Sequence, residues 1–169
     1  MERVNRILRH PLFSEELSRL ADMERERAFC GHGIAHLLDV ARIAYILNLE
    51  DRMDQEKELV YAAALLHDTG RARQYEDGTP HEKESARISA GILPDCGYSE
   101  QETALILDAI LAHRSGNTEV RQGLAEILYR ADKLSRRCFD GADEPAPCCP
   151  ECSAADICDW EMKNRLMEY

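Results

Sequence analysis

The sequence of 169 residues has no long hydrophobic run. Its longest apolar stretches, such as residues 62–66, span a few positions, whereas a transmembrane helix needs about 18 or more. The first 27 residues carry charges throughout and lack the apolar segment of a signal peptide. We therefore expect a cytoplasmic protein that neither crosses nor binds a membrane.

Glycine and proline are scarce, with 9 and 6 residues, and positive charge is in deficit, with a formal net charge of −11. The low glycine and proline content excludes a low-complexity chain. Apolar residues at 44% and charged residues at 31% are typical of a globular protein. The length fits a single domain that can bury a core without disulfides. Because duplex nucleic acid is bound through a basic face, we expect no such partner.

Helical periodicity dominates the chain, and no alternating strand pattern is visible. The spacing predicts helices over residues 13–27, 34–49, 54–67, 82–93, 99–113 and 118–135, and a short last helix over 160–167. Pro94 is expected to end the fourth of these, Ser99 and Glu102 form a capping box, and residues 75–80 read as a turn-rich loop. We predict an all-α fold, a compact bundle of about six or seven helices.

The apolar stripes of four helices run into an ionisable side chain where the pattern asks for an apolar one. His36, His67, His113 and Asp132 each extend such a stripe by one turn, and Asp68 follows His67 directly. Singly, such residues are more often hydrogen-bonded core histidines or capping aspartates than ligands. Together they are costly to bury unless a cation compensates them. Imidazole with carboxylate suits Fe, Mn, Co, Ni or Zn.

The order His36, His67-Asp68 and Asp132 resembles the H…HD…D signature of the HD-domain superfamily of metal-dependent phosphohydrolases. The local contexts agree, since Thr-Gly-Arg71 follows the His-Asp pair and Asp132 lies in Arg-Ala-Asp-Lys-Leu. The resemblance covers about residues 28–137. It implies an HD-domain helical bundle over residues 1–137.

Two further histidines match the subset of this superfamily that holds two metals. By this resemblance one metal would be bound by His36, His67, Asp68 and Asp132. The second would be bound by His81 and His113, with Asp68 as the bridge. For His81, an exposed helix N-terminus after Pro80 is the alternative interpretation.

The resemblance implies hydrolysis of a phosphate ester or anhydride of a nucleotide or other small phosphorylated metabolite by metal-activated hydroxide. Asp68, Arg71 and Lys133 would be the catalytic residues, the two cations acting on phosphate charge. Arg114 fits a surface charge better. Residues 106–134 resemble symmetrical diadenosine tetraphosphate hydrolases, so a dinucleoside polyphosphate is one candidate substrate. The ligand set also resembles the di-iron oxygenase branch of the superfamily, which stays open as an alternative.

His32 precedes His36 by four residues, as the two histidines do in the H-E-x-x-H helix of zinc proteases. Gly33 stands where the glutamate should be, and this excludes the motif. We expect His32 to support the site or the core.

The end of the chain is unusual in its cysteines. Residues 138–169 hold five of the seven, together with eight acidic and two basic residues, a net of −6. These cysteines are Cys138, Cys148, Cys149, Cys152 and Cys158. An odd number in a chain without a visible export signal argues against a disulfide framework.

The C-x-x-C within this segment can supply thiolates to zinc or to an iron–sulfur cluster, and Cys30 and His32 would join if the segment folds back. Reduced thiols in a packed tail are the alternative. We expect residues 138–169 to be a Cys-rich extension packed on the same domain. A third interpretation of the function is therefore a non-catalytic metal- or redox-sensing module. The sequence leaves a homodimer open.

Overall fold

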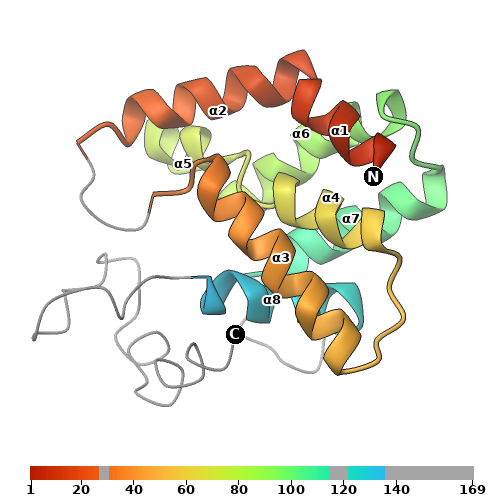
Figure 1. Ribbon diagram of the computed structural model, residues 1–169. Coiled ribbons are helices and arrows are strands. Elements are labelled where there is room, and N and C mark those ends of the chain that lie inside the picture. Colours follow the sequence, from red (N-terminus) through yellow and green to blue (C-terminus); the bar gives the residue numbers. More distant parts are fainter. Residues whose placement is uncertain (27–30, 115–121, 136–169) are drawn as a thin grey trace, which may run out of the picture.

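The computed structural model describes residues 1–26, 31–114 and 122–135, and there the chain forms eight α-helices and no strand (Figure 1). This confirms the predicted all-α fold. None of these helices has the length and apolarity needed to cross a membrane. The helices are α1 (Glu2–Arg9), α2 (Pro11–Met23), α3 (Ile34–Glu50), α4 (Lys57–Leu66), α5 (Arg71–Asp77), α6 (His81–Asp95), α7 (Glu100–Ala112) and α8 (Leu124–Leu134).

Helix α4 lies in the centre of the bundle because its sequence is apolar on nearly every side. Seven of its ten residues are buried, including Leu59, Val60 and residues 62–66. A helix of this kind must be enclosed by others, and α4 packs against α1, α3, α6, α7 and α8. Figure 1 shows α4 behind α3, with α7 and α8 on the side away from α2. The carboxyl end of α4 therefore places residues 67 and 68 in the interior.

The sequence does not predict α1 and α5, and so the described residues hold more helices than the predicted six or seven. Each has too few apolar positions for a stripe: α1 buries Val4 and Ile7, and α5 buries Arg71 and Ala72. The loop predicted over residues 75–80 begins only after Asp77. There Gly78 ends α5 at a φ of +78°, a left-handed conformation that glycine adopts readily.

Several helix boundaries differ from the prediction, and α2 runs over Pro11–Met23 where a helix over residues 13–27 was predicted. Helix α6 continues through Pro94 and ends at Asp95. In the last turn of a helix, the missing N–H of a proline removes only one backbone hydrogen bond. Helix α4 begins three residues late, since the preceding Asp54 has a φ of +53°. Helix α8 begins only at Leu124, with residues 122 and 123 outside it, so the predicted start at residue 118 is wrong. The helix predicted over 160–167 lies outside the described residues.

Helix α7 begins where the sequence predicts. The Ser99 side chain accepts a hydrogen bond from the Glu102 amide, and the Glu102 carboxylate accepts one from the Ser99 amide. This capping box is confirmed, and it fixes the register of a helix whose far end carries His113.

Gly70 lets α6 approach the end of α4 closely. A Cβ atom at this position would lie 2.5 Å from the Ser85 nitrogen and 2.6 Å from the His81 oxygen. The Gly70 amide donates to Ser85 Oγ at 2.9 Å. Because only glycine leaves this space free, the Thr-Gly-Arg segment brings His81 beside Asp68.

Candidate metal centre

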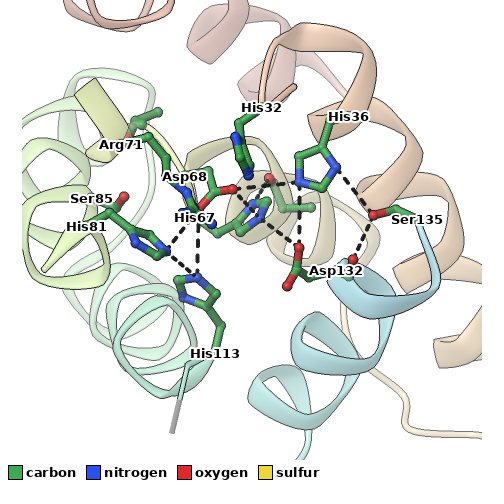
Figure 2. Close-up of polar contacts among 12 residues, drawn as sticks. His32, His36, His67, Asp68, Arg71, His81, Ser85, His113, Asp132 and Ser135 are labelled. Carbon is green, nitrogen blue, oxygen red and sulfur yellow. Dashed lines mark hydrogen bonds and ion pairs between the residues drawn. The ribbon is translucent and has the colours of Figure 1, made fainter. Parts of the chain in front are cut away.

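The ends of five helices bring all six predicted ligands together inside the bundle (Figure 2). Five of the six residues are buried, at 0–4% exposure, while the His36 side chain is 12% exposed. The six residues are His36 on α3, His67 and Asp68 at the end of α4, His81 at the start of α6, His113 at the end of α7 and Asp132 on α8. The burial of His81 excludes the exposed helix N-terminus considered above.

Asp68 divides this cluster into two halves. Its Oδ2 lies 3.7 Å from His36 Nε2 and 3.4 Å from His67 Nε2. Its Oδ1 lies 3.1 Å from His81 Nε2 and 3.9 Å from His113 Nε2. Each oxygen of one carboxylate therefore faces a different pair of histidines, which is the arrangement that a bridging ligand requires.

Asp132 completes the first half. Its Oδ1 lies 3.6 Å from His36 Nε2 and 3.8 Å from His67 Nε2, and its Oδ2 pairs with Lys133 Nζ at 3.2 Å. The ligand atoms of His36, His67 and Asp132 lie within 4.8 Å of one another, as do those of His67, Asp68 and His113. These two groups are compact enough to hold a metal ion.

Three buried atoms of the first half have no hydrogen-bond partner in the part of the chain that the structure describes. They are His36 Nε2, His67 Nε2 and Asp68 Oδ2. An unsatisfied buried polar atom costs about 1–3 kcal/mol, so three of them facing one another indicate a missing positive partner. Two imidazole nitrogens with carboxylate oxygens fit a divalent transition metal.

Two of the histidines are oriented by the helices that they end. His67 Nδ1 donates to the Ala64 carbonyl at 2.7 Å, and His113 Nδ1 donates to the Ile110 carbonyl at 2.5 Å. The last carbonyls of a helix have no amide partner within the helix, so an imidazole there can occupy one of them. In both residues Nε2 is then left to face the cluster.

The other two histidines are oriented by side chains that lie outside their own helices. His81 Nδ1 lies 2.7 Å from Gln74 Oε1 on α5, and His36 Nδ1 lies 3.3 Å from Ser135 Oγ. Ser135 in turn donates to the Asp132 carbonyl at 2.8 Å. Partners of this kind fix the tautomer and ring direction of a metal-binding histidine.

The electrostatics of the cluster favour a bound cation. Burial, reinforced by the nearby His67, lowers the pKa of His113 to about 3, and burial also lowers the pKa of His81. Burial opposes ionisation of Asp68, but Arg71 and His67 together hold its pKa well below the usual range. Burial likewise opposes protonation of His67, but the nearby Asp68 and Asp132 together raise its pKa. His81 and His113 as neutral imidazoles beside an ionised Asp68 are in the forms that bind metals, and His67 must lose its proton to do so.

The predicted cations lie at the rim of the cluster. Arg71 is 7% exposed and its Nε donates to Asp68 Oδ1 at 3.1 Å. Lys133 pairs with Asp132 as described above. Arg114 Nη1 lies 3.4 Å from His81 Nδ1. This exposed residue therefore contacts the cluster, whereas the sequence indicated a surface charge away from it.

Sequence reasoning missed the residues that support the cluster. Gln74, Ser135 and Glu24 belong to no motif or apolar stripe, and each contacts a histidine of another element, at separations of 7, 99 and 8 residues respectively. For His32, the four-residue spacing from His36 was a signal that the two side chains could lie close together. The structure buries His32 beside His36 and pairs it with Glu24.

The cysteine prediction falls outside the described residues. Cys30 and the five cysteines of residues 138–169 all lie there. A metal site in this segment therefore stays a prediction.

Comparisons with known proteins identify a family and several relatives of this chain. A family model described as "HD domain" matches residues 33–137. An uncharacterized protein of Clostridium beijerinckii is 42% identical over 171 residues and covers the whole of both chains. Ribonuclease Y of Sulfurimonas denitrificans is 32% identical over 121 residues, which are 71% of this chain and 21% of that protein. The chain thus spans about a fifth of the length of that ribonuclease.

A solved structure shares the fold. The crystal structure of a predicted HD superfamily hydrolase from an uncultured Thermotogales bacterium matches with a TM-score of 0.56 and 26% identity. The match covers 72% of this chain and 66% of that one.

Proposed function

The chain belongs to the HD domain family, and on that basis we propose that it is a metal-dependent phosphohydrolase. The proposed substrate is a phosphate ester or anhydride of a nucleotide, a dinucleoside polyphosphate or another small phosphorylated metabolite. The observation that carries the proposal is that the two oxygens of Asp68 face two separate histidine pairs. Two divalent ions of Fe, Mn, Co, Ni or Zn suit this donor set.

Each half of the cluster would hold one ion. His36, His67, Asp68 and Asp132 would hold the first, and His81, His113 and Asp68 the second. Bound metal would act as a Lewis acid for a phosphoryl oxygen and would make water nucleophilic at neutral pH.

The chain itself supplies charge for the phosphate. Arg71 and Lys133 hold positive charge beside Asp68 and Asp132, close to where a phosphoryl group would gain negative charge. Arg114 adds a third cation at the His81 side. Local charges of this kind dominate the field of the site, so the net charge of −11 does not oppose a phosphate substrate.

The relatives favour phosphoester cleavage over oxygenation. A ribonuclease cleaves the phosphodiester backbone of RNA, and the Thermotogales neighbour is described as a hydrolase. RNA itself is a less suitable substrate here, because a polyanion extends well beyond the site and there meets a chain of net charge −11. The di-iron oxygenase alternative would use the same ligands but would consume oxygen.

An anaerobic hydrolysis screen tests the proposal. Protein purified without added metal is assayed for phosphate or nucleotide release from nucleotides, dinucleoside polyphosphates and small phosphate esters. We expect release that a chelator abolishes, that Mn²⁺ or Fe²⁺ restores, and that His67→Ala removes, while the distant His10→Ala keeps it. No release from any of these compounds, or turnover that requires oxygen, would contradict the proposal.

A further inference from the structure

Helix α3 is apolar on nearly every side, but the described helices cover only part of its surface. Only five of its 17 residues are polar or charged, and six of the 17 are buried. A helix of this composition is normally enclosed by others, as α4 is. Among the described elements, however, the main contacts of α3 are with α4 and α8. Figure 1 shows α3 at the front of the bundle, with no labelled helix across it. One face of α3 therefore lacks a partner in the part of the chain that the structure describes.

The uncovered face carries apolar side chains around a central pair of opposite charges. Ile34 and Leu49, near the two ends of α3, are 42% and 59% exposed. Asp39 and Arg42 pair at 3.3 Å, and their side chains are largely exposed. Residues three or four positions apart lie on the same side of a helix, so one face collects six residues. We call it the α3 stripe, and it consists of Ile34, Leu38, Asp39, Arg42, Tyr45 and Leu49.

The order of chemistry along the α3 stripe is the same from either end. A two-fold axis through its middle would set two copies antiparallel, with Ile34 of one copy opposite Leu49 of the other. Leu38 would likewise lie opposite Tyr45 of the second copy. In the middle, the Asp39 carboxylate of each copy would face the Arg42 guanidinium of the other, because the two charges meet in reverse order. A two-fold interface requires a surface that is complementary to itself in this way.

We propose that the α3 stripe is the interface of a homodimer, in which two copies of α3 pack antiparallel about a two-fold axis. Each α3 then gains the enclosure that its apolar composition requires. Tyr45 is already held from the α4 side, where its ring centroid lies 6.1 Å from that of Tyr61, so little side-chain freedom is lost on association. His36 projects from the same helix into the bundle (Figure 2), and each chain keeps its own metal centre. The inference does not depend on the proposed hydrolase activity.

Sedimentation velocity of the full chain over a wide range of protein concentration tests the interface. We expect the wild type to form dimers. Leu49→Glu and Ile34→Glu should each raise the dissociation constant at least about tenfold, because each would bury a charge without a partner. Leu105→Glu is the matched control, since Leu105 is a similarly exposed apolar residue on α7, and it should leave the dissociation constant unchanged. Circular dichroism would confirm that the variants are folded.

Two charge variants test the antiparallel pairing. Arg42→Asp gives the α3 stripe two acidic groups and Asp39→Arg gives it two basic groups, so each variant alone should dissociate. An equimolar mixture should form heterodimers about as tight as the wild-type dimer, because unlike charges again face each other. A general loss of structure would not produce this recovery.

Three results would overturn the inference. A wild type that stays monomeric would leave the face to another part of the chain or to a different protein. A dimer that Leu49→Glu and Ile34→Glu leave intact would have its interface elsewhere. A mixture of the two charge variants that stays dissociated would exclude the antiparallel contact between Asp39 and Arg42.

Discussion

The direction of each histidine ring decides whether it can bind a metal, and this is set by the partner of Nδ1. For His67 and His113 that partner is a carbonyl of the same helix. For His81 it is a side chain on another helix, Gln74 of α5. His81, and likewise His36 with its partner Ser135, are therefore the ligands whose orientation a single side-chain substitution can release.

Gln74→Leu should weaken metal binding in the half of the cluster that contains His81. The substitution removes the acceptor of His81 Nδ1, and loss of such a partner typically reduces metal affinity about 10–100-fold. Titration of metal-free protein with Co²⁺ or Mn²⁺ would measure the change. Gln101→Leu, at an exposed position of α7, is the matched control. Equal affinities in the two variants would show that Gln74 does not orient the ring.

At the scale of residues, the sequence predicts the inward-facing side chains better than their supports. His36, His67, His113 and Asp132 interrupt apolar stripes, and a stripe is a local pattern that one helix displays by itself. The contacts of Gln74, Ser135 and Glu24 join one element to another, even where only 7 or 8 residues separate the partners, as for Gln74 and Glu24. They depend on how helices pack, which the spacing of apolar residues does not specify.

At the scale of elements, the approach of α6 to the end of α4 sets the second half of the cluster. Gly70 makes this approach possible, since a side chain there would meet the backbone of residues 81 and 85. Short helices such as α1 and α5 escaped prediction because helices of 8 and 7 residues present too few apolar positions to show a period. The longer helices α3 and α7, of 17 and 13 residues, were predictable because their apolar period is repeated over several turns.

Gly70→Ala should destabilise the fold and displace His81. Its Cβ would lie 2.5 Å from a backbone nitrogen, which cannot move without moving α6, and overpacking of this kind costs about 1–3 kcal/mol. Gly91→Ala is the matched control, since nothing lies within 4 Å of the new Cβ in the middle of α6. We expect that variant to be about 0.5–1 kcal/mol more stable than wild type. Urea unfolding measures both, and similar stabilities would contradict the packing argument.

At the scale of the whole molecule, a group of charges ties α1 to the bundle. Arg3 on α1 pairs with Glu58 at 2.6 Å, with Glu102 at 2.6 Å and with Glu56 at 2.9 Å. Its guanidinium also packs on the Tyr98 ring, 4.4 Å from the centroid. The first helix is thereby fixed to α4 and α7, on the opposite end of α4 from the metal centre.

The ion pairs around Arg3 should make the stability of the fold sensitive to acid. Hydrogen bonds from the amino terminus and from Arg3 lower the pKa of Glu58 from 4.5 to about 2. Because the pKa is lower in the folded state, the contribution is fully present above about pH 4.5 and is lost as the pH falls towards 2. Glu58→Gln should therefore lose less stability than wild type over this interval, in denaturant titrations with chelator present. Glu50→Gln, an exposed position on α3, should follow the wild type; a Glu58→Gln curve parallel to both would refute the assignment.

If Asp68 bridges two bound ions, the ratio of metal to protein must fall in steps as the ligands are removed. Wild type, His81→Ala and Asp68→Asn are purified together without added metal, with Asp108→Asn as an exposed control and circular dichroism to confirm folding. We expect ratios of about two for wild type and the control, about one for His81→Ala and near zero for Asp68→Asn. A folded Asp68→Asn variant that keeps the metal content of wild type would show that Asp68 does not join the two halves.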